Sequence, residues 1–493
     1  MFSSEPETVN PRSFNAAATD PIAVPHIPRK WKWRGAALLM RILYAESGDF
    51  ATETIRRHLQ NLAQIFRVAP RRETAREPRT ICAMLDLLAV IDSLTRLRME
   101  QMTAAITAVI AGVLFYCTTK PVQGHFDYTF RIADALLRGH AGLATKPPSW
   151  LNEFVPVHGR YYSVFPLGAV LANIPAAIAF KLGLVRAWPA RGLAAAIAAG
   201  CTFFFYRLTC VREDITALRR VLLAVFPVFA TWTWCNLGFA GAWQIALGFA
   251  VLGQAGALYH TLVRRNALLA GIWFTVAVGN RTELVLTLPA FLFLLAKYPP
   301  TLPKFVKGEQ LRTFALFFTF PAALLLSTAM YNWARFGSIT DFGYAHIPGV
   351  LNEPWYQHGI FSLNSIRWNA YEMLFRGLND LPTFPYLKPY GFGCSIFLAS
   401  PFLFLLFRED GQRRCMYWII IGVLTFTLWA HGNPGGWQFS YRYGVILLPW
   451  MFLLITENGP AGLSAIEVSL FVVATAINAI ATYEFLWTSM IRV

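Results

Sequence analysis

The stretch MTAAITAVIAGVLFYCTT (Met102–Thr119) and the polar loop that follows it, Lys120–Arg160, decide the fold of this chain. The first part carries no charge, and its 18 residues are enough for a helix to cross the hydrocarbon core of a bilayer. A second uncharged run, Tyr161–Phe180, begins where the loop ends. Because lipid cannot satisfy exposed backbone groups, both runs are predicted to be membrane-spanning helices, with the loop at the membrane surface.

The composition of the whole chain is that of a polytopic membrane protein. Of its 493 residues, 56% are hydrophobic and 14% are charged, and the mean hydropathy is +0.44. A soluble protein is about a quarter charged. The net charge of +16 lies mostly in short loops and the N-terminal region, which favours membrane lipids over nucleic acid as partners. The seven cysteines form no CxxC pair and are expected to be small buried hydrophobes.

Further uncharged runs predict an all-α polytopic membrane protein with about 11 transmembrane helices, within a range of about 10–13. The predicted spans are 102–119, 161–180, 192–206, 221–238, 242–262, 266–296, 313–332, 389–407, 415–431, 442–456 and 461–483. The run 266–296 is too long for one straight helix and is interrupted by the polar residues Asn280–Glu283. It is therefore either one bent crossing or a re-entrant hairpin.

Residues 1–101 differ from the membrane domain 102–493. The first 30 residues are rich in Pro, Ser and Ala and are predicted to be disordered, and the bases that follow favour a cytoplasmic location. Met99 and Met102 directly precede the first apolar run. The preceding segment is therefore either a cytoplasmic N-terminal region or an extension that is not a working domain.

Short basic loops set the predicted orientation in the cytoplasmic membrane. The bases at 408–414 and 297–312 mark two loops as cytoplasmic, which agrees with a cytoplasmic N-terminal region if 266–296 is one crossing. The segments then expected on the outer side are 120–160, 333–388 and 432–441. The loop 207–220 also falls outside, although it is basic. Its arginines are Arg207, Arg212, Arg219 and Arg220.

The first outer loop contains a predicted amphipathic helix, Phe126–His140. Its apolar face consists of Phe126, Phe130, Ala133 and Leu137, and its charged stripe consists of Asp127, Arg131, Asp134 and Arg138. Such a helix fits the membrane interface. In one interpretation Asp127 is a general base for an acceptor hydroxyl, and Arg131 or Arg138 neutralises a phosphate. In the other, the stripe consists of ordinary surface ion pairs.

Neighbouring residues add weaker candidates. His125 and Asp127, with His140 and His158 nearby, are the residue types that bind a divalent metal, but their spacing is not diagnostic. We expect no firm cofactor.

Glu153 and the residues that start the second run form another candidate group. Arg160 is placed to bind a lipid phosphate, and Tyr161 or Tyr162 to stack on a sugar. An equally good interpretation is an interfacial aromatic anchor.

Two later segments lie at the outer ends of predicted spans. YNWARFGSITDFGYAH (Tyr331–His346) contains Arg335, and NPGGWQFSYRY (Asn433–Tyr443) is a Gly-rich aromatic turn. The candidate residues of that turn are Trp437, Tyr441 and Arg442. Glycine lets the backbone approach a ligand closely, but a tight turn with interfacial aromatics would have the same composition. Asn280–Glu283 is either a functional polar group near membrane depth or a helix break whose charges satisfy one another.

Together these motifs resemble the GT-C superfamily of integral-membrane glycosyltransferases, such as the protein mannosyltransferases and aminoarabinose transferases. The matching segments are HFDYTFRIADALLRGHAGL, GRYYSVFPLGAVLANIP, GNRTELVLTLP, YNWARFGSITDFGY and GGWQFSYRYGVILLP, which fall within residues 102–455. The resemblance implies a GT-C-like fold and an enzyme of cell-envelope glycan biosynthesis with its active site outside. The donor would be a polyprenyl-phosphate sugar, and the acceptor a glycan, lipid or protein hydroxyl.

The resemblance also implies a mechanism. Asp127 matches the catalytic acid of the family and would deprotonate the acceptor, with Glu153 or Asp134 assisting. The acceptor oxygen would attack the anomeric carbon, and the lipid phosphate would leave with inversion and without a required metal. The candidates for binding the phosphate are Arg160, Arg442, Arg335 and Arg131. The candidates for binding the sugar or acceptor are Tyr161, Tyr162, Trp437 and Tyr441.

Two other functions fit part of the pattern. A membrane transporter or lipid flippase without transferase activity would share the many spans, and Arg281 with Glu283 favours it. The absence of a repeat between the halves and the polar outer loops favour the enzyme. A non-catalytic scaffold with the same fold is the third possibility.

Overall fold

The computed structural model describes residues 76–120, 126–298, 308–383, 387–388, 393–408, 413–436 and 438–488. The predicted disorder of the first 30 residues and the candidates His125 and Trp437 lie outside this part.

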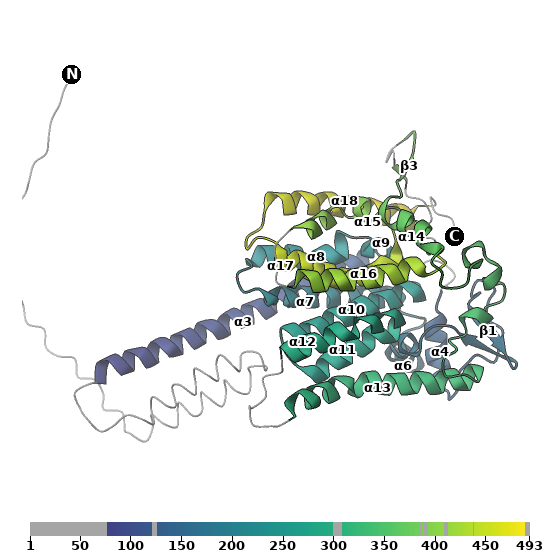
Figure 1. The fold of residues 1–493 in the computed structure, drawn as a ribbon, viewed down its shortest axis with the longest axis horizontal. Helices are drawn as coiled ribbons and strands as arrows, with labels where there is room; N and C mark the ends of the chain where they lie inside the picture. Colours follow the sequence, from purple (N-terminus) through teal and green to yellow (C-terminus); the bar gives the residue numbers. More distant parts are fainter. Residues whose placement is uncertain are drawn as a thin grey trace, which may run out of the picture. The chain divides into compact units, whose positions relative to one another are not determined.

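The chain is mostly helical (Figure 1). The α-helices are α3 (Arg76–Thr118), α4 (Tyr128–Leu136), α5 (Leu167–Leu171), α6 (Ile174–Lys181), α7 (Ala190–Leu208), α8 (Ala217–Phe229), α9 (Thr233–Gly238), α10 (Ala242–Leu262), α11 (Ala267–Asn280), α12 (Leu288–Lys297), α13 (Glu309–Phe336), α14 (Ser365–Leu374), α15 (Ile396–Ala399), α16 (Arg414–Ala430), α17 (Leu448–Asn458) and α18 (Ala465–Trp487).

Short 3₁₀ helices and two strand pairs connect these helices. The 3₁₀ helices are η1 (Thr209–Val211), η2 (Thr282–Thr287), η3 (Tyr344–His346), η4 (Val350–Asn352), η5 (Pro354–Tyr356), η6 (Pro401–Phe407) and η7 (Arg442–Leu447). The strands are β1 (Phe154–Val157), β2 (Arg160–Ser163), β3 (Asn379–Asp380) and β4 (Leu387–Lys388), and β1 pairs with β2 and β3 with β4, both antiparallel.

Long apolar helices confirm the prediction of a mostly helical membrane protein. Among the described residues, the helices long and apolar enough to cross a bilayer are Arg98–Thr118, Ala190–Val211, Ala242–Leu262, Glu309–Phe336 and Ala465–Trp487. Several of them expose large apolar side chains, such as Val113 of α3 and Leu325 of α13, which suits contact with lipid. Helix α3 continues without a break through residues 101 and 102, where the N-terminal region was expected to end.

The predicted span 161–180 is wrong, because this segment starts and ends beside α4. Its first residues form β2, and the short helices α5 and α6 follow. The Asn173 side chain between them donates to Thr129 Oγ1 of α4 at 3.1 Å. At the end of α6, Lys181 Nζ lies 3.4 Å from the carbonyl oxygen of Leu137. The apolar residues of this segment therefore pack against the first loop instead of crossing the membrane.

The long helices α3 and α7 consequently run antiparallel as consecutive crossings. Arg191, at the start of α7, donates a hydrogen bond to Tyr116, at the end of α3. Its Nε lies 2.6 Å from the Tyr116 carbonyl oxygen. Arg207 at the other end of α7 lies 3.9 Å from Glu100. The basic loop 207–220 is therefore at the Glu100 end and not at the end that holds the first loop.

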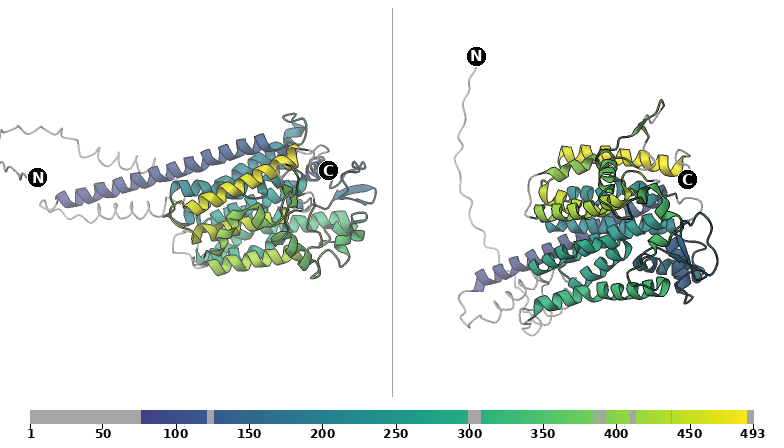
Figure 2. Two further views of the ribbon diagram at one scale, coloured as in Figure 1. Left: turned by 90° about the horizontal axis from the view of Figure 1, so that it is seen from above. Right: turned by 45° about the vertical axis from the view of Figure 1, so that its right-hand side comes forward.

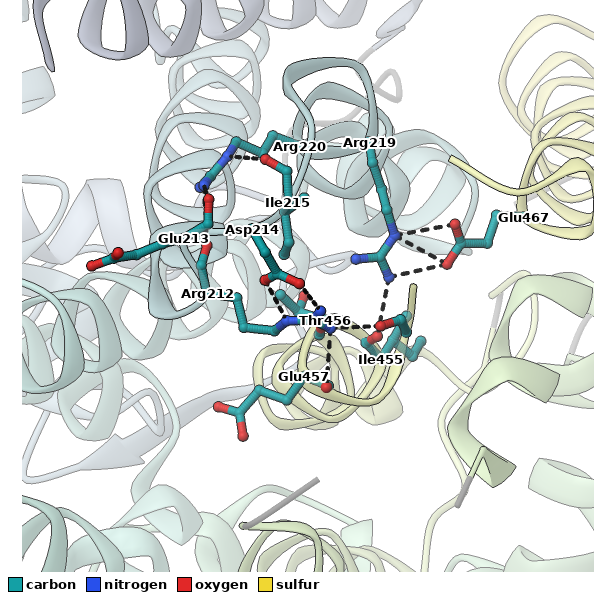
Figure 3. Close-up of polar contacts among 11 residues, drawn as sticks. Arg212, Glu213, Asp214, Ile215, Arg219, Arg220, Ile455, Thr456, Glu457 and Glu467 are labelled. Carbon is teal, nitrogen blue, oxygen red and sulfur yellow. Dashed lines mark hydrogen bonds and ion pairs between the residues drawn. The ribbon is translucent and has the colours of Figure 1, made fainter. Parts of the chain in front are cut away.

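A cluster of charged residues places further loops at the Glu100 end (Figure 3). Arg219 of α8 binds the Glu467 carboxylate of α18 at 3.0 Å. Arg408 binds the same carboxylate at 2.8 Å. Arg212 donates to the carbonyl of Thr456 at 3.3 Å. The prediction that loop 207–220 lies opposite the bases at 408–414 is therefore wrong, and the lost crossing at 161–180 explains the error.

The interrupted run at 266–296 is a hairpin. Helix α11 ends at Asn280, and η2 and α12 lead the chain back to Tyr298. The ring of Tyr298 lies under the guanidinium groups of Arg265, at 5.9 Å, and of Arg413, at 5.6 Å. Both ends of the hairpin therefore lie near the same group of bases, and its tip, Arg281–Glu283, points away from them.

The helices thus run between two ends of the structure, as Figure 2 shows. The charged contacts given above distinguish these two ends. We call the end with Arg207, Arg219 and Arg408 the basic end. The opposite end, which holds the described residues of the loops 119–120, 126–189, 337–383, 431–436 and 438–441, is the loop end. The hairpin tip reaches the loop end through a close contact, because a Cβ added at Gly168 of α5 would lie 2.3 Å from the Cα of Gly279. Only glycine permits this approach.

Candidate functional site

A cavity of about 640 Å³ lies at the loop end, where five parts of the chain meet. Its walls come from the segment between β2 and α5, the start of α10, the hairpin tip, the loop that follows α13, and the end of α16. The polar and aromatic residues that line it include Trp243, Arg281, Glu283, Asp341, Tyr344 and His431.

A second cavity of about 320 Å³ shares the hairpin tip and His431 with the first. It adds the apolar residues Val285, Leu286 and Leu428. Two of these, Val285 and Leu286, are exposed on the surface of the described structure. The two cavities together offer a polar chamber beside an apolar one, with Arg281 lining both.

Two guanidinium groups flank the ring of Tyr443 next to these cavities. The Arg281 group lies 4.9 Å and the Arg442 group 5.0 Å from the ring centroid. Arg281 also binds Glu283, with Nε 2.7 Å from Oε1. Arg442 donates to the carbonyl of Gly436 and to the Tyr443 hydroxyl, both at 3.1 Å, and has no carboxylate within ion-pair distance among the described residues. Its positive charge is therefore left for a ligand or for more distant acids.

Trp243 connects the first loop with the cavity. Its indole nitrogen donates to Glu153 Oε2 at 2.9 Å, and its ring packs against Phe126 at 5.3 Å and Tyr128 at 5.1 Å. Burial raises the pKa of the Glu153 carboxyl to about 7, opposed by the Trp243 hydrogen bond and by Arg442 and reinforced by Glu353. This carboxyl therefore changes its charge near neutral pH.

The predicted amphipathic helix of the first loop is confirmed as α4. Asp127 is its buried N-terminal flanking residue, and Oδ1 accepts a hydrogen bond from Arg131 Nε at 2.7 Å. Asp134 and Arg138 form the second pair of the predicted stripe at 2.5 Å. Among the described cavities, neither is lined by Asp127 or Arg131. The described link between this pair and the cavity is Phe126, which precedes Asp127 and packs against the cavity residue Trp243.

Three residues predicted to bind a ligand are instead packed in the interior. Arg335 is 2% exposed and donates to the carbonyl of Ser163 and, at 2.6 Å, to Asn332 Oδ1. The buried Tyr441 hydroxyl donates to the carbonyl of Leu428 at 3.1 Å. Tyr162 is also buried. Their donors and rings are engaged within the protein, and none of the three lines a described cavity.

Arg160 and Tyr161 belong to the β1–β2 hairpin. Arg160 pairs with Val157 across the turn, and Tyr161 exchanges two backbone hydrogen bonds with Leu143. Neither residue lines a described cavity.

His431, at the end of α16, is a cavity residue that the sequence analysis did not select. Its Nδ1 lies 2.9 Å from the carbonyl oxygen of Asn433, so Nδ1 carries the proton and Nε2 has the free lone pair. Burial lowers the pKa of His431, and Arg281 and Arg442 add to this effect. The imidazole is therefore neutral at pH 7 and able to accept a hydrogen bond.

Asp341 and Trp243 were missed for different reasons. Asp341 stood within the quoted segment 331–346, and its Oδ2 lies 2.7 Å from His346 Nε2 while Oδ1 accepts from the Gly343 N–H at 2.6 Å. Burial opposes the charge of Asp341, but His346 and that N–H outweigh it and hold its pKa below the usual range. Trp243 had the sequence context of an ordinary interfacial tryptophan.

Within the part of the chain that the structure describes, no three His, Cys, Asp or Glu side chains are grouped closely enough to hold a metal ion.

The chain was compared with protein-family models, with curated proteins and with solved structures, and it matches none of them.

Proposed function

We propose that this protein is an integral-membrane glycosyltransferase that moves a sugar from a polyprenyl phosphate to an acceptor hydroxyl at the loop end. The observation that carries the proposal is the pair of cavities that meet at Arg281. A lipid-phosphate sugar needs a basic site for its phosphate, an apolar path for its chain and a polar chamber for its sugar. Arg281, the smaller cavity with Val285 and Leu286, and the larger cavity match these three needs. The order of the GT-C-like motifs supports the same function.

The loop end is assigned to the outer face because the bases gather at the other end. Arg207, Arg219 and Arg408 all lie at the basic end, which the positive-inside rule makes cytoplasmic. The segment 161–180 no longer counts as a crossing, whereas the hairpin 267–298 counts as two. The proposed number of membrane crossings therefore stays at about 11.

The proposed reaction is a single displacement. The acceptor oxygen bonds to the anomeric carbon as the bond from that carbon to the phosphate oxygen breaks, and the electron pair leaves with the phosphate. Arg281 and Arg442 stabilise the charge that develops there. The acceptor proton goes to a carboxylate on the first-loop side of Trp243, with Asp127 as the base indicated by the resemblance and Glu153 as the assisting acid.

The test is transfer of a labelled sugar from a polyprenyl phosphate by the purified protein in lipid nanodiscs. Asp127→Asn is expected to lower the rate about a hundredfold or more, within the usual range for loss of a general base. Asp214→Asn is the matched control, since it makes the same change at the exposed ion pair with Arg212 at the basic end, and it is expected to retain the rate. Equal rates for both variants and the unchanged protein would remove Asp127 from the mechanism.

Transport is the second candidate, and the hairpin tip is the observation that favours it. Interrupted helices that bring charges to a cavity, as Arg281 and Glu283 do, are typical of transporters. The discriminating measurement is lipid movement across vesicles that contain the protein, made beside the transfer assay. Arg281→Met is expected to abolish transfer. Lipid movement without any sugar transfer would refute the enzyme and support the transporter.

A further inference from the structure

The helix α14, in the loop that follows α13, has inverted polarity. Its exposed face carries Trp368, Tyr371 and, just past its end, Phe375, which are 43%, 46% and 71% exposed. Its buried face carries the polar residues Asn369 and Glu372, which are 0% and 2% exposed. A helix on a water-facing surface has the opposite arrangement.

The buried face of α14 is tied down by specific bonds. Asn369 Nδ2 donates to the carbonyl oxygens of Trp429 and His431, at 3.0 Å and 2.6 Å, at the end of α16. Glu372 binds Arg376, four residues on, at 2.9 Å, so its buried charge is compensated locally. Rotating the helix to hide its aromatic face would break the bonds of Asn369 to α16 and bury Asn369 without a partner, which is costly. The aromatic face is therefore held outward.

The position of α14 matches the level of the outer membrane interface. Exposed aromatic residues mark the loop-end termini of three long helices, and they are Tyr116 of α3, Trp333 of α13, and Tyr483 and Trp487 of α18. Tryptophan and tyrosine gather at the boundary between head groups and acyl chains. Helix α14 packs against α16 at the same end of the structure (Figure 1).

The adjoining surface indicates lipid as the occupant. Helix α16, against which α14 packs, exposes Ile419, Val423 and Phe426 along its length, as a lipid-facing helix does. Arg367, next to Trp368 in the sequence, is also exposed, and a long arginine side chain at a membrane surface can bury its stem while its charged group stays at the level of the phosphates.

We infer that α14 is an interfacial helix whose Trp368, Tyr371 and Phe375 are embedded in the outer leaflet of the bilayer. It anchors the loop 337–383 to the membrane beside the cavity, because Phe361, four residues before α14, lines both cavities. This inference does not depend on sugar transfer and would hold equally for a transporter.

The test measures how accessible a spin label is to two relaxation reagents, one that partitions into lipid and one that stays in water. Tyr371→Cys is labelled in the full chain, in nanodiscs of phosphatidylcholine and phosphatidylglycerol, after the exposed Cys117 and Cys415 are changed to serine. Gln357→Cys, at an exposed turn of the same loop, is the matched control. Relaxation by dissolved oxygen reports on the apolar layer, and relaxation by a nickel chelate reports on water.

The expected result is a clearly higher ratio of oxygen to nickel accessibility at position 371 than at position 357. A second label at Phe375→Cys gives the same readout if the first variant folds poorly. A high nickel accessibility at 371 and 375 would place α14 in water and overturn the inference. Protection from both reagents would also overturn it, because a protein surface would then cover the helix.

Discussion

At the basic end of the helices, Arg219 and Glu467 are both 0% exposed and bind each other at 3.0 Å, and Arg408 binds the same carboxylate. At the loop end, Arg442 has no carboxylate partner among the described residues, and Glu153 keeps a pKa of about 7 beside a cavity. The same kinds of side chain are thus used in two ways. Charges that neutralise each other hold helices together, whereas charges left uncompensated are available to a ligand.

The arginine cluster at the basic end is closely packed around Gly459. A Cβ added at Gly459 would lie 2.0 Å from Arg219 Nη2 and 3.0 Å from Arg408 Nη1. Glu467 also caps its own helix, since its backbone N–H donates to Ser464 Oγ at 3.2 Å and its carboxylate accepts from the Ser464 N–H. One carboxylate therefore joins α8, α18 and the chain at Arg408, which explains why so many bases meet there.

Breaking this closed cluster gives the largest expected effect. Glu467→Gln removes the charge that compensates Arg219 and Arg408, and loss of one partner of a buried ion pair costs about 3–5 kcal/mol. The free energy of unfolding of the purified protein in detergent is expected to fall by this amount. The measurement is denaturant-induced unfolding followed by circular dichroism.

The matched control for this variant is Glu213→Gln. Glu213 is exposed in the loop before α8, at the same end of the structure, so the same change is expected to alter the unfolding free energy by less than about 0.5 kcal/mol. If the two variants were equally stable, the cluster at the basic end would not hold the helices, and the contrast between the two ends would fail.

At the loop end, the uncompensated carboxyl of Glu153 predicts a dependence of stability on pH. Its pKa is about 7 in the folded protein and about 4.3 in an unfolded chain. Between these values the folded protein binds more protons, so the stabilising contribution is complete below about pH 4.3 and is lost as the pH rises through 7. After a discount for the partial exposure of Glu153, the loss is about 2 kcal/mol.

The measurement is the difference in unfolding free energy between the unchanged protein and Glu153→Gln, taken from pH 4 to pH 9. The difference cancels the titration of other groups. Trp243→Phe sharpens the result, because removing the donor to the charged carboxylate should increase the loss. A difference that does not change with pH would mean that Glu153 is ionised throughout and that its charge is compensated after all.

The sequence predicted local features better than distant ones. The pairs Asp127–Arg131 and Asp134–Arg138 could be expected because spacings of four residues on a helix fix the distance between side chains. The segment 161–180 could not be placed, because apolar composition is the same for a helix in lipid and for one packed against α4. That one error moved the basic loop 207–220 to the wrong end.

The cavity depends on contacts between distant parts of the chain. The interruption at Arg281 was visible in the sequence, but its position at the tip of a hairpin follows from the packing of Tyr298 against Arg265 and Arg413. His431 and Trp243 come from helices far apart in the sequence. No local pattern indicates that both face the same chamber.

The smallest expected effect separates the two pairs of α4. In the Asp134–Arg138 pair the arginine side chain is exposed. The pair should therefore contribute about 0.3–0.5 kcal/mol to the free energy of unfolding, as exposed helix pairs do. Asp127–Arg131 has the same spacing, but the Asp127 side chain is only 10% exposed, so its coupling should be larger. The measurement is a double-mutant cycle on the free energy of unfolding for each pair, with Asp→Asn and Arg→Met changes.

Equal couplings would mean that Asp127 is in a solvated pair like its neighbour, and the first loop would then belong with the compensated charges of the basic end. A larger coupling for Asp127, together with loss of sugar transfer in Asp127→Asn alone, would place it with the charges held ready at the loop end.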